Sequence, residues 1–368
     1  MLKKIDAKII IFGILALLII GGAFVLYKLQ FKKEIQLKTE EKTGNINILL
    51  LGRGGGKHEA PNLTDTIIVA TINPEKKMMN LVSIPRDLWS PDLQAKVNTA
   101  YSYGQDKDGQ GKLLAKTILG RITGKQIDYV LVIDFSGYVK LVDHLGGIDV
   151  NVRNTLDDYK YPIEDKEDDP CEKTPEEIID LSAQIATGSA SETDAFPCRY
   201  KYIHFDKGVQ HMNGETALEF VRSRHGVNGE GSDFARAQRQ QDVINAIRDK
   251  SLSLGIILNP LKVLGAFNII KDNIDTNARV TEIDDFINLA NKMQGAKITS
   301  TVIDFGDEAK KRYGLLTTPS IGNAAKYRQW VLIPRAGDGN FSEIKEYLTC
   351  IEEGLVCEIG EEGIKRRR

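Results

Sequence analysis

Two apolar segments joined by a turn, TIIVATINPEKKMMNLVSIPRDL at residues 66–88, decide the fold class of this chain. The β-branched run at 66–72 and the apolar run at 79–84 have the composition of buried strands. Asn73 and Pro74 lie between them, and an Asn-Pro dipeptide is typical of a turn. Because proline cannot extend a central strand, the second strand is predicted to end at Pro85.

Strands and helices alternate on both sides of this pair. Further strands are predicted at 47–51, 129–134 and 148–152, with helices at 113–119, 135–145, 214–221 and 234–250. The alternation continues through 261–271, 283–293, 298–303, 330–333 and 341–349. This order predicts an α/β layered domain at residues 45–353.

The N-terminus is strongly apolar. Residues 7–27 read AKIIIFGILALLIIGGAFVLY, and about 20 such residues are enough to cross a bilayer as a helix. The stretch lacks a small-residue cleavage site, so it is predicted to be a retained transmembrane anchor. Residues 1–6 would then form a short cytoplasmic end, and the polar residues 28–44 would form a linker.

An acidic and then small, polar stretch at residues 156–199 interrupts the domain and is predicted to be a surface insertion. The four cysteines form two local sets, Cys171 with Cys198 and Cys350 with Cys357. An even number of cysteines outside the membrane favours two disulfides, each closing a short loop, and thus an extracytoplasmic domain. The end of the chain, residues 354–368, is predicted to be a solvated basic tail.

Composition and motifs exclude several classes of function. The formal net charge of −2 predicts no general attraction to nucleic acid. The glycine-rich loop at 52–56 is one residue too short for a Walker loop, and Lys57 stands where a dinucleotide fingerprint needs its third glycine. The chain has no G-x-S-x-G motif, so a lipase-type triad has no support.

Basic residues cluster instead around a glycine-rich turn, in VRSRHGVNGEGSDFARAQRQQ at residues 221–241. Arg222 and Arg224 are two positions apart and share a face if the backbone is extended. Residues 226–231 are expected to be a mobile link, after which Ser232 or Asp233 caps a new helix. On that helix one face carries Asp233, Arg236 and Gln240, whereas Arg239 points elsewhere. Convergent guanidinium groups near a helix N-terminus predict a site for phosphate or pyrophosphate.

A second charged set follows the strands at 66–84. Arg86 and Asp87 come directly after Pro85, where the carboxyl end of a strand meets ligands in α/β sheets. Asp65 precedes the first strand and is a candidate ligand for a divalent cation, which pyrophosphate sites usually need. Asp87 and Asp233 are further carboxylate candidates.

The segments NILLLG, LTDTIIVATINP, LVSIPRDLW, VNTAYSYG, IDYVLVIDFSGYVKLVDHLGGIDVNV, GVQHMNGETALEFVRSRH and GSDFARAQRQQDVI resemble, in order and spacing, the LytR–CpsA–Psr family. Members of that family attach anionic glycopolymers to bacterial peptidoglycan. The resemblance covers residues 45–349 and follows a single N-terminal span, as in the family. It implies an α/β sandwich with a central mixed β-sheet flanked by helices and an apolar groove for a polyprenyl chain.

The resemblance also implies roles for individual residues. Asp65 matches a magnesium-binding aspartate, so the expected cofactor is Mg²⁺ or Mn²⁺. Arg86 matches a phosphate-binding arginine. The residues expected to bind the lipid pyrophosphate are Arg222, Arg224, Arg236 and Gln240.

The sequence departs from the family pattern at two places. The loop at 52–56 lacks the family's second metal-binding aspartate, and Leu63 stands before Thr64 where the family has an arginine. Metal binding would then rest on Asp65 with phosphate oxygens and water, or Arg53 would replace part of the metal's charge.

The expected activity is that of a single-pass, membrane-anchored phosphotransferase. It would move an anionic glycopolymer from polyprenyl pyrophosphate to a peptidoglycan hydroxyl, with Arg86 and Arg224 stabilising the phosphoryl charge and Asp87 or Asp233 as general base. Two alternatives stay open. One is a hydrolase that passes the same lipid-linked pyrophosphate to water, and the other is a non-enzymatic envelope regulator or scaffold.

Overall fold

The computed structural model describes residues 37–40, 43–56, 60–251, 269, 273–307, 312–320 and 326–367. The predicted membrane anchor at 7–27 lies outside these residues, as does the predicted helix at 261–271 apart from residue 269. Within the described part of the chain, no helix combines the length and the apolar composition that a membrane crossing requires.

A six-stranded mixed sheet forms the centre of the molecule, in the order β11-β6-β1-β2-β3-β12. Its strands are β11 (Ile274–Thr276), β6 (Tyr129–Asp134), β1 (Ile46–Arg53), β2 (Thr64–Asn73), β3 (Met78–Ser83) and β12 (Lys297–Val302). β1 runs parallel to β6, and β3 runs parallel to β12, whereas β2 is antiparallel to both β1 and β3. The predicted pair of strands is thus the hairpin β2–β3, and the predicted mixed sheet is confirmed.

The strands read as nearly continuous apolar runs because both faces of the sheet are buried. Leu49, Leu51 and Val69 point into one core cluster, and their neighbours Ile68 and Ala70 point into another on the opposite face. Alternate side chains of a strand lie on opposite faces, so a strand that is covered on both sides has no polar alternation.

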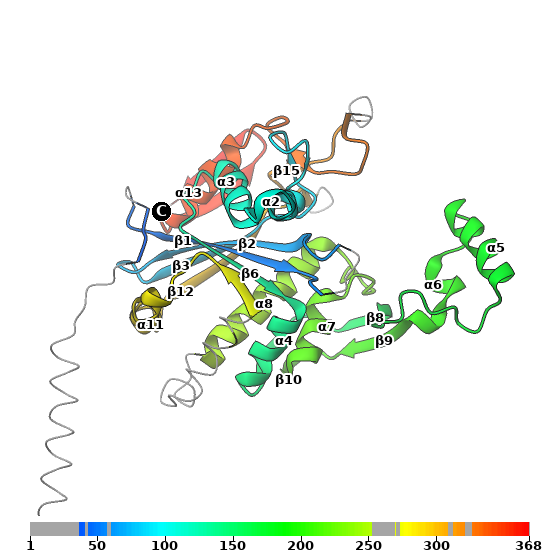
Figure 1. Ribbon diagram of the computed structural model, residues 1–368. Helices are drawn as coiled ribbons and strands as arrows, with labels where there is room; N and C mark the ends of the chain where they lie inside the picture. The colour runs from blue at the N-terminus through cyan, green and yellow to red at the C-terminus, as the bar shows by residue number, and fades with distance from the viewer. Residues whose placement is uncertain are drawn as a thin grey trace, which may run out of the picture.

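Helices cover the two faces of the sheet (Figure 1). One face carries α2 (Ala100–Asp108), α3 (Gly111–Thr123) and α13 (Ser342–Glu352). The other carries α4 (Phe135–His144), α7 (Gly214–Arg222), α8 (Asp233–Ser251) and α11 (Ile283–Lys292). Apart from α2, which was not predicted, these helices match predicted ones, and most of their ends agree within three residues.

Several chain segments meet at one edge of the sheet. β1, β6, β3 and β12 all end there, and β2 begins there, because its direction is opposite. Arg53, Asp65, Arg86 and Asp134 thus lie at or just beyond the same edge. Ligands of α/β sheets bind at such edges.

The predicted insertion forms an arm that extends away from the sheet (Figure 1). Its two strands, β8 (Leu156–Pro162) and β9 (Tyr200–Phe205), are antiparallel, and α5 (Pro175–Ala186) and α6 (Glu192–Ala195) lie between them. The insertion therefore extends to Phe205 rather than ending at residue 199, because β9 pairs with β8. Below, "the arm" means residues 156–205.

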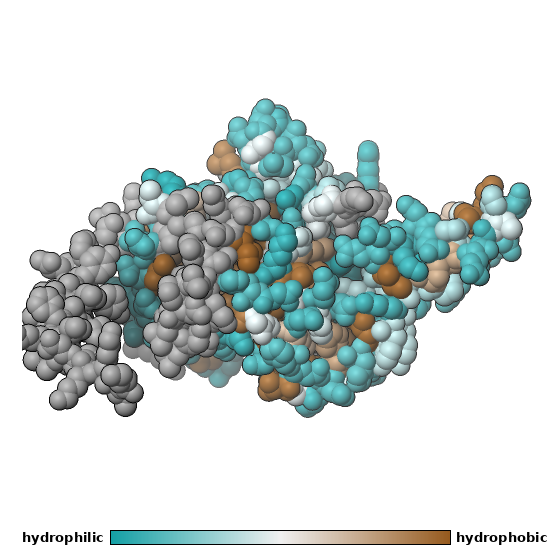
Figure 2. Space-filling model, turned by 60° about the horizontal axis from the view of Figure 1, so that its bottom comes forward, coloured by the Kyte–Doolittle hydropathy of each residue, from teal (hydrophilic) through white to brown (hydrophobic). Residues whose placement is uncertain are grey.

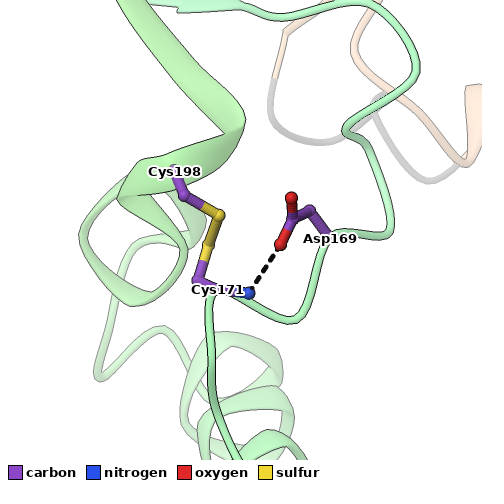
Figure 3. Close-up of side chains that lie close together, drawn as sticks. All are labelled: Asp169, Cys171 and Cys198. Atoms are coloured by element: carbon purple, nitrogen blue, oxygen red, sulfur yellow. Dashed lines mark hydrogen bonds between the residues drawn. A yellow bond between two sulfur atoms is a disulfide. The ribbon is translucent and has the colours of Figure 1, made fainter.

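Both predicted disulfides are present. Cys171 is bonded to Cys198 within the arm, where the Cys171 N–H also donates to Asp169 at 2.9 Å (Figure 3). Cys350 is bonded to Cys357. Asp169 with Cys171 and Cys198 has the proximity of a metal site, but both sulfur atoms are used in the disulfide.

The C-terminus differs from the prediction of a solvated tail. Residues 356–367 form a hairpin of β17 (Val356–Gly360) and β18 (Gly363–Arg367). Ile359 and Ile364 pack against the main core, and the Cys350–Cys357 disulfide joins the hairpin to α13. The basic side chains are exposed on the hairpin, which explains why their pattern resembles a tail.

The remaining described elements are short or peripheral. They are β4 (Trp89–Ser90), β5 (Ala95–Lys96), β7 (Ile148–Val152), β10 (Gly208–Met212), β13 (Gly306–Asp307), β14 (Arg312–Tyr313), β15 (Leu316–Thr317), β16 (Ile333–Pro334) and three 3₁₀ turns at 97–99, 197–199 and 280–282. The strand predicted at 330–333 is thus reduced to β16.

Candidate functional site

Asp65 is the centre of the charged edge. Its Oδ1 accepts a hydrogen bond from Arg86 Nη1 at 2.7 Å, and its Oδ2 accepts one from Arg224 Nη2 at 2.8 Å. These arginines come from the end of β3 and from the segment after α7, so three distant parts of the sequence meet at one carboxylate. The structure therefore brings together the predicted metal ligand and two of the predicted phosphate-binding arginines.

The electrostatics of this cluster favour a charged Asp65. Burial acts to raise the pKa of the Asp65 carboxyl, but the positive charges of Arg224 and Arg86 act against it. The charge of Arg236 adds to their effect, and the pKa lies below its ordinary value of 3.8. A single carboxylate balanced by three guanidinium groups leaves an excess of positive charge, as a site for phosphate groups requires.

Asp87 is a buried partner of the same cluster. Its Oδ1 accepts from Lys96 Nζ at 2.6 Å, and its Oδ2 lies 3.5 Å from Arg86 Nε. Both carboxylate oxygens thus face cations. Asp87 is therefore better placed to orient the Arg86 guanidinium than to remove a proton from a substrate.

The loop between α7 and α8 positions Arg224, and it is tied down rather than free. Ser223 Oγ and the His225 N–H both donate to Asp158 Oδ2 of the arm, at 2.7 and 3.2 Å. Arg239 of α8 is buried and donates to the carbonyls of Phe220, Ser223 and Glu230 at 2.7–2.9 Å. The expectation of a mobile link at 226–231 therefore does not match the bonding of this loop.

Arg222 takes a different position from Arg224, although the two are only two residues apart. Arg222 is the last residue of α7, and its guanidinium lies over the ring of Phe135, 4.2 Å from the centroid. Arg224 follows the helix end and reaches Asp65. The two side chains therefore do not point the same way, because the helix continues to Arg222 and the expected extended backbone begins only after it.

Arg236 and Gln240 lie one helical turn apart on α8 and line a cavity of about 230 Å³ together with Asp65, Arg86 and Asp87. Asp304 also lines this cavity, and the rest of the lining is mostly apolar, with Ile67, Ile84, Pro85, Phe234, Ala237, Val302, Ile303, Phe305, Trp330 and Leu332. Ser232 caps α8, since its Oγ accepts from the Ala235 N–H at 3.1 Å. Asp233 begins the helix, and its side chain lies outside the described part of the structure.

Asp65 is the candidate metal ligand at this edge, and both of its oxygens accept hydrogen bonds from arginines in the structure. On the neighbouring strand, Arg53 occupies the edge position, donates to Asn62 Oδ1 at 2.7 Å and lies 3.9 Å from Asp134 Oδ2. Within the described residues, no cluster of three potential metal ligands includes Asp65. Mg²⁺ sites often use one or two carboxylates with substrate phosphates, and Asp65 fits that pattern as a single protein ligand.

Sequence reasoning missed two residues of the site, Arg239 and Asp158. Spacing correctly placed Arg239 off the phosphate face, but nothing in the sequence distinguishes a buried arginine that binds carbonyls from a solvated one. Asp158 belongs to an acidic run that reads as surface, yet its side chain is fully buried against Ser223. Only the folded structure places Asp158 against Ser223.

Comparison with known proteins identifies the family of this chain. The family model LytR_cpsA_psr matches residues 26–322. Bacillus subtilis polyisoprenyl-teichoic acid–peptidoglycan teichoic acid transferase TagV is 29% identical over 225 residues, which cover 60% of this chain and 46% of TagV. The match therefore spans less than half the length of that relative.

Two further similarities extend over more of the chain. The transferase TagU of Bacillus cereus is 28% identical over 292 residues, which cover 73% of this chain and 77% of TagU. The crystal structure of Bacillus subtilis TagV has a TM-score of 0.53 at 25% identity and covers 84% of this chain and 97% of that one. Because the family model matches most of the sequence, this chain belongs to the LytR–CpsA–Psr family.

Proposed function

We propose that this chain is a membrane-anchored phosphotransferase that moves an anionic glycopolymer from a polyprenyl-pyrophosphate carrier to peptidoglycan. The observation that carries the proposal is the cluster of Arg86, Arg224 and Arg236 around Asp65, which borders a largely apolar cavity. The family membership and the printed names of TagV and TagU support it.

The arginines match the chemistry of phosphoryl transfer. Negative charge builds on the phosphoryl oxygens as the bond to the polyprenyl phosphate loosens, and fixed guanidinium groups stabilise this charge. In the free protein, Asp65 holds Arg86 and Arg224 close together. The bound pyrophosphate would accept hydrogen bonds from the same guanidinium groups, which are already oriented. Gln240 lines the cavity and would contribute a further contact to the substrate, whereas Arg222 lies over the Phe135 ring.

The apolar cavity supports binding of the lipid part of the donor. Its lining combines apolar side chains such as Ile67, Ile303 and Leu332 with a charged set that includes Arg86 and Arg236. A polyprenyl pyrophosphate has the same division, with an apolar chain attached to a charged head. The cavity would therefore take the first isoprene units while the pyrophosphate stays among the arginines.

A divalent cation, Mg²⁺ or Mn²⁺, is proposed to bind Asp65 together with the pyrophosphate oxygens. When bound, it would neutralise part of the phosphate charge. Asp65 would hold the ion, and Arg53 would supply positive charge from the neighbouring strand. Of the two candidates for accepting the proton of the acceptor hydroxyl, Asp233 is preferred, because both oxygens of Asp87 face cations. Asp87 also holds Arg86 in place through its contact with Arg86 Nε.

The proposed location is the outer face of the cell membrane, with residues 7–27 as a single-pass anchor. The two disulfides support an oxidising, extracytoplasmic environment for the domain.

The test measures transfer of polymer from a lipid-linked donor to purified peptidoglycan by the full chain in detergent. Arg224→Ala and Arg86→Ala should each lower kcat/KM by roughly ten- to a thousandfold, as loss of one charge-stabilising donor does. Arg121→Ala is the matched control, because Arg121 is 61% exposed on α3 and pairs only with Asp92 in a surface contact. Wild-type turnover by Arg224→Ala would refute the assignment.

The same assay separates the alternative hydrolase. A transferase consumes donor in proportion to added acceptor, whereas a hydrolase releases polymer at the same rate when the acceptor is left out. Omission of Mg²⁺ in the presence of a chelator tests the cofactor, and the wild-type rate without divalent cations would remove the metal from the proposal.

A further inference from the structure

Three aromatic rings form a row on the exposed face of the arm. Tyr159 of β8 and Tyr202 of β9 stack at 4.7 Å between ring centroids with 20° between their planes. The His204 ring lies 6.2 Å beyond Tyr202. Tyr159 and Tyr202 are 62% and 51% exposed, although a large ring gains from being covered. We call these three residues the aromatic platform.

The platform is held in shape by a single carboxylate. Asp157 Oδ1 accepts from Tyr202 Oη at 2.6 Å and contacts His204 Nδ1 at 2.7 Å. Stacking covers one face of each tyrosine, and His204 lies beside the other face of Tyr202. The Tyr159 ring is the more exposed of the two tyrosines on the platform, and the polar groups of Asp157 and His204 lie beside its stacking partner Tyr202.

The strand that carries Tyr159 also contacts the loop that carries Arg224. Asp158, the neighbour of Tyr159, accepts from Ser223 and His225, the residues on either side of Arg224. The Val227 N–H also donates to the Asp157 carbonyl at 2.9 Å. By chain geometry, the backbone of Tyr159 lies within roughly 15 Å of the backbone of Arg224. Tyr159 and Asp158 point to opposite faces of β8, so an extended molecule on the platform would reach the arginine cluster by passing around the hairpin.

The charge of the arm restricts what it can bind. Residues 156–205 contain thirteen Asp and Glu but only five Lys and Arg, and Figure 2 shows a largely hydrophilic surface on the arm. A polyanion would be repelled by this surface, whereas a sugar chain without phosphate would not. The proposed reaction has two substrates, the anionic glycopolymer donor and the peptidoglycan acceptor. Only the peptidoglycan acceptor has a sugar chain without phosphate.

We propose that the aromatic platform of the arm binds sugar rings of the peptidoglycan acceptor strand and delivers its hydroxyl to the arginine cluster. The proposal rests on the proposed function. The C–H groups on one side of a pyranose ring carry partial positive charge and pack on the negative face of an aromatic ring. The hydroxyl groups at the ring's edge bond to neighbouring polar side chains, which Asp157 and His204 supply. This combination of an apolar face with adjacent polar groups is typical of a specific small-ligand site.

The experiment compares Tyr159→Ala and Tyr159→Phe in the full chain in detergent, with Tyr103→Ala as the matched control. Tyr103 is 48% exposed on α2, outside the arm. Two readouts are taken: the KM values for acceptor and donor, and sedimentation of the protein with insoluble peptidoglycan freed of attached glycopolymer. Tyr159→Ala should raise the acceptor KM about five- to tenfold and weaken sedimentation to match, with donor KM unchanged. Tyr159→Phe and Tyr103→Ala should both behave as wild type.

The outcomes separate this inference from the function on which it rests. If transfer depends on Arg224 but neither acceptor KM nor sedimentation responds to Tyr159→Ala, the platform inference is wrong and the proposed function stands. If Tyr159→Ala changes the donor KM alone, the arm serves the polymer and the inference is also wrong. If wild-type protein transfers nothing but its sedimentation depends on Tyr159, the proposed function fails and the sugar-binding surface stands.

Discussion

Replacing Arg239 with methionine should both destabilise the protein and release the loop that carries Arg224. The Arg239 side chain is 4% exposed and donates to three backbone carbonyls and to Glu230 Oε2, the last at 3.0 Å. Methionine fills a similar volume but leaves the carbonyls and the Glu230 carboxylate without these donors. Breaking a buried ion pair by removing one partner costs about 3–5 kcal/mol, and we expect a loss near the middle of that range.

Denaturant unfolding of the purified full chain measures this loss, with Arg121→Met as the control. Arg121 and Asp92 are 61% and 46% exposed, and such a surface pair contributes about 0–1 kcal/mol. Limited trypsin digestion measures the loop, because Arg222 and Arg224 become cleavable when the loop opens. Arg239→Lys should fall between wild type and Arg239→Met, since an ammonium group cannot reproduce the fork of a guanidinium. If Arg239→Met unfolds at the wild-type denaturant concentration and resists trypsin equally, the loop is not held by this residue.

Three further predictions follow from the same structure. Folding lowers the pKa of Asp65, so its charge contributes stability above the unfolded pKa of about 4, and this contribution is lost as the pH falls below that value. Asp65→Asn should therefore flatten the pH dependence of the melting temperature on the acid side, and an unchanged profile would contradict the pKa direction. Ala237→Phe narrows the apolar cavity and should raise KM for long-chain donors more than for donors with one or two isoprene units, whereas an equal rise would place the chain elsewhere. Replacing Cys350 and Cys357 with serine opens a loop with a sequence separation of 7 and should cost about 2–3 kcal/mol in denaturant unfolding, while wild-type stability would show that the hairpin is held without the bond.

Much of the scaffold could be predicted from the sequence, because strand and helix patterns are local. β2 and β3 read directly from residues 66–84, and their ends place Asp65 and Arg86 at one edge of the sheet. The cysteine pairs followed from their separation along the chain. The C-terminal hairpin was missed because arginines and lysines dominate its sequence, whereas two isoleucines and a disulfide fix its position.

The arginine cluster shows which features of the site can be predicted from the sequence and which depend on the tertiary structure. Local patterns were enough to predict that Arg86 follows a strand, that Arg236 and Gln240 share a helix face and that Arg224 lies near a helix start. Only the tertiary structure decided that Arg224 reaches Asp65, a residue 159 positions away, while Arg222 turns to Phe135. It also decided that Asp158 and Arg239 hold the loop. The physical reason is that periodicity fixes which face a side chain takes within its own element, whereas the partner on that face depends on how distant elements pack.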